Sequence, residues 1–273
     1  MNRSLEGRSV VVTGGGTGIG AACAALAADE GAHVTICGRT EQRLDDTARR
    51  IRAAGGDVAT VVADVTVEAD VERLVHAAVE FGGGLDGVVA NAGGGGTLAP
   101  YHLQDTDEYV RILELNVLST MICVKHAVPH LARGGGSFVG MSSIAGHVTH
   151  PYMGAYPVAK AAIEHLMRNA ADEYGQVHVR FNSVQPGFIT TEVMEAVRPG
   201  SPVWESYVSQ TPLGGVGDPQ DVAQLVRFLL SDESRWITGQ AIAVDGGHCL
   251  RRGPDYSSIV ARLPGGDVAG LAT

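Results

Sequence analysis

The chain has 273 residues, of which 45% are hydrophobic, and a formal net charge of −10 at pH 7. An acidic chain lacks the basic surface that nucleic acid or an anionic membrane requires, so we expect neither as a partner. No apolar run reaches the ~18 residues of a membrane span, and no signal-peptide core precedes the first strand pattern. The spacing of its cysteines and histidines suggests reduced thiols, no metal site and a cytoplasmic protein.

Short β-branched runs alternate with longer segments of helical periodicity. The expected strands are 9–13, 33–37, 59–63, 87–90, 137–141, 179–184 and 241–244. The expected helices are 20–30, 41–54, 68–81, 107–133, 156–174 and 219–231. Apolar strands separated by helices indicate a parallel sheet covered on both faces. We therefore predict an α/β fold, a single doubly wound Rossmann domain with a parallel seven-stranded sheet, over residues 1–247.

The segment 190–217 interrupts this alternation with helical composition and three prolines. It lies above the carboxyl ends of the strands, where open sheets bind ligands, so we predict a substrate loop or lid. Its apolar character suggests a substrate with apolar surface, such as a 3-oxoacyl thioester or a cyclic or aromatic ketone. The lid candidates are Phe188, Val193, Met194, Val197, Val203, Trp204 and Tyr207. Three further side chains either line the pocket or face solvent: His147, His150 and Tyr152.

The first expected strand runs into a glycine-rich turn that opens a helix. Glycines let a backbone approach a pyrophosphate, and a helix N-terminus supplies N–H groups and positive potential. The spacing is Gly-x-x-x-Gly-x-Gly, which departs from the Gly-x-Gly-x-x-Gly of the common dinucleotide fingerprint. The cofactor-binding residues predicted in this turn are Gly14, Thr17, Gly18, Ile19 and Gly20.

One of only two lysines, Lys160, follows Tyr156 by four residues; the other is Lys125. Residues four apart share one face of a helix, so the phenol and the ammonium can point into one site. A fixed cation favours the phenolate and lowers the pKa of a tyrosine from about 10. The pair is a candidate general acid/base. The alternative is a surface tyrosine above a solvated lysine.

The glycine turn and the Tyr-x-x-x-Lys tetrad together resemble the short-chain dehydrogenase/reductase family, and the chain is similar to its 3-oxoacyl-carrier-protein reductase-like members. The resemblance covers about residues 5–247. It implies four catalytic residues, namely Asn116, Ser143, Tyr156 and Lys160. It implies that Tyr156 protonates the developing alkoxide, that Ser143 fixes the carbonyl oxygen, and that Lys160 lowers the phenol pKa and holds ribose hydroxyls. Asn116 would hold a water that connects Lys160 to solvent.

The same resemblance implies further residues at a nicotinamide cofactor. Besides Tyr156 and Lys160, they are Asp64, Val65, Asn91, Ala92, Gly93, Pro186, Gly187, Ile189 and Thr191. An NAD enzyme usually carries Asp or Glu about 20 residues after the glycine turn, where this chain has Gly38, followed by Arg39. An arginine can bind a 2′-phosphate bidentately, so we expect NADP rather than NAD, with Arg43 assisting. The alternative is that Arg39 is a solvated surface residue.

The resemblance implies an NADPH-dependent carbonyl reductase, reversible as an alcohol dehydrogenase, that acts on a ketone or 3-oxoacyl-type substrate. The alternatives are an NAD(P)-linked hydroxyacyl, sugar-alcohol or steroid dehydrogenase and, outside enzymes, an NADP(H)-binding regulator. A regulator has no need of a proton donor, so the four catalytic-type residues speak against it. Family relatives are commonly tetramers or dimers, and we expect a homotetramer, paired through the segments 107–133, 156–174 and 241–244.

Residues 248–273 extend beyond the usual end of the family. Leu250, Tyr256 and Ile259 make this extension too apolar for a solvated tail. We expect residues 248–263 to pack across a subunit interface toward the partner's substrate loop, with Arg251 or Arg252 near the pocket mouth. The alternative is an extension that lies on its own subunit.

Overall fold

The computed structural model describes residues 4–191, 197–251, 253–254 and 256–266. Its centre is a seven-stranded sheet in the order β3-β2-β1-β4-β5-β6-β7, in which every pairing is parallel. The strands are β1 (Ser9–Thr13), β2 (His33–Gly38), β3 (Asp57–Val62), β4 (Gly87–Ala90), β5 (Gly136–Met141), β6 (Val179–Pro186) and β7 (Ala241–Val244). The predicted α/β Rossmann fold is confirmed.

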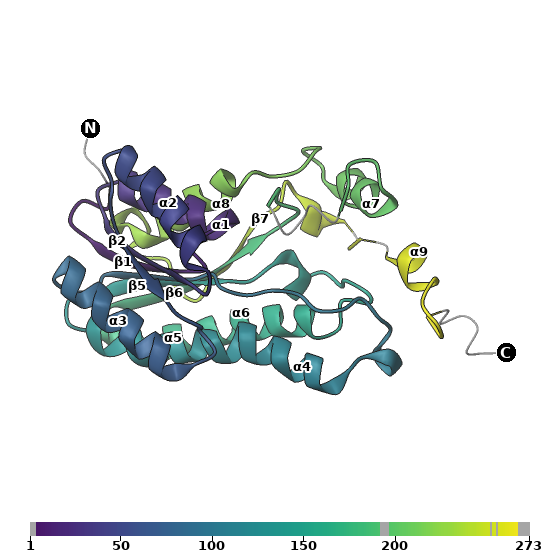
Figure 1. Cartoon of the computed structure of the whole chain (residues 1–273), viewed down its shortest axis with the longest axis horizontal. Helices are drawn as coiled ribbons and strands as arrows, with labels where there is room; N and C mark the ends of the chain where they lie inside the picture. The colour runs from purple at the N-terminus through teal and green to yellow at the C-terminus, as the bar shows by residue number, and fades with distance from the viewer. Residues whose placement is uncertain (1–3, 192–196, 252, 255, 267–273) are drawn as a thin grey trace.

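Helices cover both faces of the sheet (Figure 1). One face carries α1 (Gly18–Asp29), α2 (Glu41–Ala53) and α8 (Pro219–Leu230). The other face carries α3 (Glu68–Gly82), α4 (Thr106–Leu113), α5 (Ser119–Leu131) and α6 (Ala155–Tyr174). Each helix turns an apolar stripe to the sheet; in α3 it consists of Val71, Leu74, Val75 and Ala78. Two buried clusters result, one on each face.

Strand β3 begins two residues before the predicted start, at Asp57. Asp57 pairs with His33 of β2, and its carboxylate lies 2.6 Å from the His33 ring. This cross-strand contact holds a residue of low strand propensity in the sheet, so local composition did not reveal it.

The helix predicted over 107–133 is divided by a π-helical turn, η2 (Glu114–Leu118). Three side chains bond back to carbonyl oxygens four residues earlier: Asn116 to Ile112 (2.8 Å), Ser119 to Leu115 (2.5 Å) and Thr120 to Asn116 (2.7 Å). Such back-bonding competes with the regular helical ladder, and π-turns often mark functional sites.

By length and composition alone, the continuous helical stretch Thr106–Leu131 could cross a membrane, which differs from the sequence expectation. Its apolar residues are explained by packing, since α5 lies against α3 and α4 against α6. Ile122, Ala127 and Leu131 are buried in the core of that sheet face. The stretch is therefore a core helix of the fold.

Two short helices lie beyond the sheet, toward one end of the molecule (Figure 1). They are α7 (Pro202–Gln210), within the predicted lid segment, and α9 (Ser257–Val260), within the C-terminal extension. The predicted lid residues Val193 and Met194, and Arg252 of the extension, lie outside the described residues.

Candidate active site

The turn after β1 depends on glycine at specific points. Gly14 and Gly18 have φ values of 65° and 52°, and a Cβ atom on Gly20 would lie 2.2 Å from the Gly14 carbonyl oxygen. In the chain as described, Thr17 does not cap α1 through its side chain, and the first turn of α1 holds no acidic residue. The N–H groups at this helix start are therefore open to an anion such as a pyrophosphate.

Hydrogen bonds connect the carboxyl ends of β1 and β4 next to this turn. The Thr13 hydroxyl accepts hydrogen bonds from the backbone N–H groups of Asn91 (3.0 Å) and Ala92 (2.9 Å). The Asn91 amide donates to the Thr13 carbonyl oxygen at 3.0 Å. The strand order reverses between β1 and β4, which opens a crevice at the carboxyl edge. Our sequence analysis missed Thr13, although its place at a strand end before glycine was a usable signal.

Gly93, Asn116 and Lys160 converge at this crevice. A Cβ atom on Gly93 would lie 2.5 Å from Asn116 Oδ1 and 3.3 Å from Lys160 Nζ. Lys160 is only 4% exposed, and its ammonium donates to the Met141 carbonyl oxygen at 2.8 Å. The fold therefore brings the end of β4, the π-turn and α6 to one point.

The π-turn fixes the orientation of Asn116, which is fully buried. Its amide nitrogen donates to the carbonyl oxygens of Gly94 (2.9 Å) and Ile112 (2.8 Å), and its Oδ1 accepts from the Gly94 N–H at 3.3 Å. The side chain thereby ties the loop after β4 to the helix.

Ser143 and Tyr156 stand on the other side of Lys160. The Ser143 hydroxyl accepts from the Ala145 N–H at 3.2 Å and lies close enough to the Tyr156 phenol to favour its ionised form. The ring centre of Tyr156 is 5.4 Å from Lys160 Nζ. Ser142 points elsewhere, with its hydroxyl 2.9 Å from both the Lys160 carbonyl oxygen and Glu164 Oε1. Ser143 is therefore the serine that faces the tyrosine.

Burial shifts the pKa values of the acid/base pair in opposite directions. It raises the pKa of the Tyr156 phenol, which the Ser143 hydrogen bond partly offsets and the nearby Tyr256 phenol reinforces. It lowers the pKa of Lys160 from 10.5 to about 8. The expected lowering of the Tyr156 pKa by Lys160 is therefore not found in this structure. The lysine directs its charge at a backbone carbonyl, and the removal of water from both groups dominates.

The predicted phosphate-binding arginines lie at the end of β2. Arg39 and Arg43 are exposed, and no ion pair engages either within the part of the chain described. A Cβ atom on Gly16 would lie 3.2 Å from Arg43 Cβ, so Arg43 stands against the glycine turn. A side chain at Gly38 would meet only Leu44, at an ordinary contact distance of 3.6 Å.

The remaining predicted cofactor residues follow the ends of β3 and β6. Asp64 accepts from the Thr66 hydroxyl at 2.7 Å, and Val65 is buried. Gly187 passes so close to Asp245 that a Cβ atom would lie 2.7 Å from its Cα. Pro186 ends β6, Ile189 pairs with Gly217, and Thr191 is the last residue described before the gap at 192.

An aromatic cluster lies next to the acid/base pair. The Phe188 ring stacks on Tyr207 at 4.3 Å, and Trp204 meets Phe188 edge-on at 5.3 Å. Tyr207 and Tyr256 are buried, and their hydroxyl oxygens are 3.1 Å apart. The other side chains in or against this cluster are Leu98, Tyr152, Met153, Val197, Val203 and Val216. The cluster joins the lid segment to the C-terminal extension.

The sequence left open whether three residues of the loop before α6 line the pocket or face solvent, and they differ in the structure. His150 is buried, and its ring centre is 6.2 Å from that of Tyr207. Tyr152 packs against the cluster with φ of 71°, a conformation unusual for a bulky side chain. His147 is exposed.

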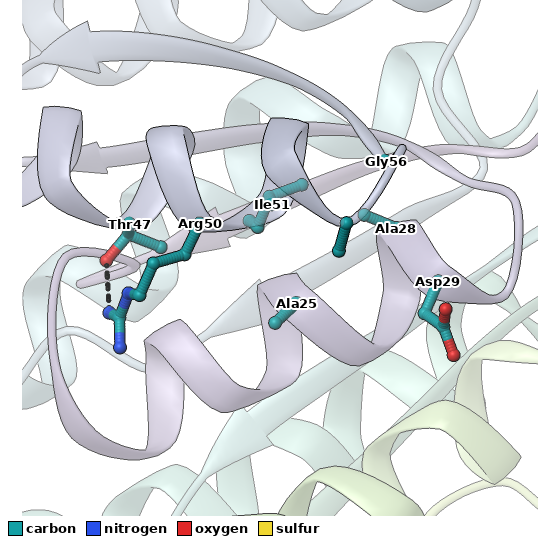
Figure 2. A pocket seen from close by; sticks show the side chains of 8 residues that line it. Ala25, Ala28, Asp29, Thr47, Arg50, Ile51 and Gly56 are labelled. Carbon is teal, nitrogen blue, oxygen red and sulfur yellow. Dashed lines mark hydrogen bonds between the residues drawn. The ribbon is translucent and has the colours of Figure 1, made fainter.

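A separate cavity of about 140 Å³ lies between α1 and α2, away from the polar cluster (Figure 2). Its walls include Ala25, Ala28 and Ile51, and Arg50 at its edge donates to the Thr47 hydroxyl at 3.1 Å. The groups with acid/base chemistry converge instead at the carboxyl edge of the sheet, which is the candidate active site.

Comparison with known proteins identifies the family of the chain. Residues 14–248 match the profile of a family described as enoyl-(acyl carrier protein) reductase. The chain is similar to cis-4-hydroxycyclohexanecarboxylate dehydrogenase from Sinomonas cyclohexanicum, with 38% identity over 91% of this chain and 99% of that one. The fold is similar to that of a short-chain type dehydrogenase/reductase from Mycobacterium ulcerans, with a TM-score of 0.93 and 42% identity over 95% and 96% of the two chains.

It is also similar to 7α-hydroxysteroid dehydrogenase in complex with NADH and 7-oxo glycochenodeoxycholic acid, with a TM-score of 0.86 and 32% identity over 90% and 96% of the chains. The protein belongs to the short-chain dehydrogenase/reductase family. It is an NAD(P)-dependent dehydrogenase that acts on CH–OH groups.

The burial of Lys160 predicts a stability gain when the charge is removed. At pH 7 the lysine is charged in both the folded and the unfolded state, so the folded state bears the full desolvation cost. Because the folded-state pKa of about 8 lies below 10.5, the free energy of unfolding should rise between these pH values. We expect Lys160→Met to increase the free energy of unfolding at pH 7 by about 1–3 kcal/mol and to abolish turnover. The variant should also lack the increase in stability between about pH 8 and pH 10.5 that the wild type shows.

Urea unfolding at pH 7 and pH 10 measures both effects. Lys125→Met is the matched control, since Lys125 is an exposed lysine paired with Glu68 at 2.5 Å. Its loss should change stability by less than about 1 kcal/mol at either pH. A Lys160→Met protein less stable than the wild type at pH 7 would contradict the argument.

Proposed function

We propose that the protein is an NADPH-dependent carbonyl reductase, reversible as an alcohol dehydrogenase, that interconverts a ring ketone and the corresponding secondary alcohol. The observation that carries this proposal is the convergence of Asn116, Ser143, Tyr156 and Lys160 beside an open helix start. A proton donor, a hydrogen-bond donor and a buried cation at one edge form the set that carbonyl reduction requires.

The glycine turn and the start of α1 would hold the pyrophosphate of a nicotinamide cofactor, which supplies or accepts the hydride. Ser143 would donate a hydrogen bond to the substrate oxygen, and Tyr156 would donate its proton to that oxygen as negative charge develops. The raised pKa of Tyr156 keeps the phenol protonated before the reaction. Lys160 would hold the ribose hydroxyls, and Asn116 a water that links the lysine to solvent.

The ring substrate is inferred from the walls of the site. Phe188, Trp204 and Tyr207 present flat apolar surface next to Tyr156. Two of the similar proteins carry alicyclic compounds in their names, a cyclohexanecarboxylate and a steroid. A 3-oxoacyl thioester is the second candidate, which the acyl-carrier description of the matching family profile favours.

The preference for NADPH rests on Arg39 and Arg43. Arg39 is exposed just after β2, where the ribose of a dinucleotide lies in this fold, and Arg43 is exposed in the first turns of α2. Gly38 supplies no carboxylate to repel a phosphate. The steroid dehydrogenase structure contains NADH, so membership of the family does not by itself determine the cofactor.

A panel of cyclic ketones and 3-oxoacyl thioesters, assayed with NADPH and with NADH at the nicotinamide absorbance, tests the function. We expect turnover of ring ketones with NADPH. Tyr156→Phe keeps the ring but removes the proton, so turnover should fall by about 10²–10⁴-fold with little change in NADPH affinity. Tight NADPH binding without turnover of any carbonyl would favour a cofactor-sensing regulator instead.

Arg39→Ala should weaken NADPH binding about ten- to a hundredfold, since a charge-assisted hydrogen bond contributes about 1.5–3 kcal/mol. Adding Gly38→Asp, for which the structure has room, should then shift preference toward NADH. Cofactor titrations measure both changes. The control is Arg49→Ala, an exposed arginine of α2 that pairs with Asp46 and should leave both affinities unchanged. A wild type that uses NADH as well as NADPH would contradict this assignment.

We further propose a cytoplasmic homotetramer with two-fold axes. Leu118 and Met121 beside the π-turn, Val158 of α6 and Trp236 before β7 are exposed apolar side chains, and Trp236 is 90% exposed. The described part of the C-terminal extension contacts its own chain at Tyr207 and Thr149, and additional packing against a partner's substrate loop remains a prediction. Light scattering at micromolar concentration should give about four times the 28.3 kDa of one chain. Trp236→Glu should reduce this mass to a dimer, whereas a monomeric wild type would contradict the proposal.

A further inference from the structure

The C-terminal extension crosses the mouth of the active site on its own chain. After β7, the Asp245 carboxylate accepts from the N–H groups of Gly247 (2.9 Å) and Cys249 (2.7 Å), which turns the chain back over the sheet edge. Farther along, Gly253 packs so tightly that a Cβ atom would lie 1.9 Å from the Thr149 carbonyl oxygen. A Cβ atom on Gly265 would contact the Leu103 side chain at 3.7 Å, on the far side of the mouth.

Tyr256 enters the pocket from this extension. It is 6% exposed, its hydroxyl meets that of Tyr207 at 3.1 Å, and its phenol lies near enough to Tyr156 to influence the acid. Tyr207 is 7% exposed, and its ring stacks on the Phe188 ring. The two hydroxyls therefore occupy a buried position near Tyr156.

This pair has one unused hydrogen-bond donor. Two phenols hold two O–H groups, and their mutual bond uses one of them. Among the described residues, no further acceptor lies within hydrogen-bond distance of either hydroxyl. A buried donor without an acceptor is costly, so an acceptor atom that a ligand brings to the second O–H would stabilise the complex.

We propose that Tyr207 and Tyr256 form the specificity end of the substrate pocket, where their free O–H binds an uncharged oxygen that the substrate carries besides its reacting oxygen. This inference rests on the proposed function, and it narrows the substrate to ring ketones or alcohols with a second hydroxyl or carbonyl group.

The charge of the preferred group follows from the surroundings of the pair. Burial raises the pKa of both phenols, so they remain neutral donors. Two buried histidine rings lie near Tyr207, with ring centres 5.6 Å away for His248 and 6.2 Å away for His150. Burial also lowers the pKa of His150, so this ring adds no positive charge at neutral pH. A carboxylate placed at this buried position would lose its hydration, which is costly, whereas a hydroxyl or carbonyl loses little.

The test is the ratio of kcat/KM for 4-hydroxycyclohexanone to that for cyclohexanone. The double variant Tyr207→Phe/Tyr256→Phe removes both O–H groups and should lower this ratio about tenfold, the effect of one lost hydrogen bond. Each single variant breaks the bond between the two phenols and leaves one O–H free, so it should lower the ratio less than the double variant does. Tyr174→Phe, which removes a hydroxyl at the distant end of α6, is the matched control and should leave the ratio unchanged.

A purely structural role for the tyrosine contact would lower kcat/KM for both ketones equally, and an unchanged ratio in the Tyr207→Phe/Tyr256→Phe variant would overturn the proposal. Higher kcat/KM for 4-oxocyclohexanecarboxylate than for 4-hydroxycyclohexanone would overturn the preference for an uncharged oxygen.

A binding measurement separates this inference from the proposed function. Trp204 packs in the cluster, and the only other tryptophan is the exposed Trp236, so a Trp236→Phe background isolates the Trp204 fluorescence. With NADP⁺ present, 1,4-cyclohexanediol should bind about tenfold more tightly than cyclohexanol, and the Tyr207→Phe/Tyr256→Phe variant should erase the difference. If no ketone is turned over but the diol still binds more tightly, the proposed function is wrong and the inference about the tyrosine pair stands. If the two alcohols bind equally, the inference is wrong.

Discussion

The active site depends on a single buried cation. Lys160 lies in α6 with its ammonium held against the end of β5, and the protein keeps it there although burial lowers its pKa to about 8. A charge in such a place is stable only where dipoles face it. The Met141 carbonyl oxygen and the nearby Asn116 side chain are such groups. The surrounding backbone holds these two groups next to the Lys160 ammonium.

The backbone around Lys160 leaves little room for other residues. Gly93 has to be glycine because any Cβ would strike Asn116, and Asn116 reaches this point because the helix widens into a π-turn. Behind them, Glu164 accepts from Ser142 (2.9 Å) and from the Gln185 side chain (2.6 Å), which ties α6 to the ends of β5 and β6. The reacting groups are thus held by a packed layer of hydrogen bonds, as preorganised catalysis requires.

The sequence predicted the parts of the molecule that local pattern controls. Strands β1, β4 and β7 were placed to the residue, since each is a short apolar run between turns. The π-turn was missed because it arises from side chains of Asn116, Ser119 and Thr120 that compete for backbone carbonyls, which periodicity does not register. The prediction for the pKa of Tyr156 considered only Lys160. Burial of the phenol and the charge of the Tyr256 phenol, a hundred positions away in the chain, both raise this pKa.

The candidate site therefore has two halves, one made of residues in recognisable sequence motifs and one made of residues that only tertiary contacts bring together. The half built on the sheet edge follows from motifs that lie at strand ends, and it contains the groups to which we assign proton transfer and cofactor binding. The other half consists of Phe188, Trp204 and Tyr207 around the lid and of Tyr256 from the extension, which contact one another only after the chain has folded. Because Tyr256 reaches both Tyr207 and the neighbourhood of Tyr156, changes in the extension can alter substrate choice without disturbing the groups that carry out the reaction.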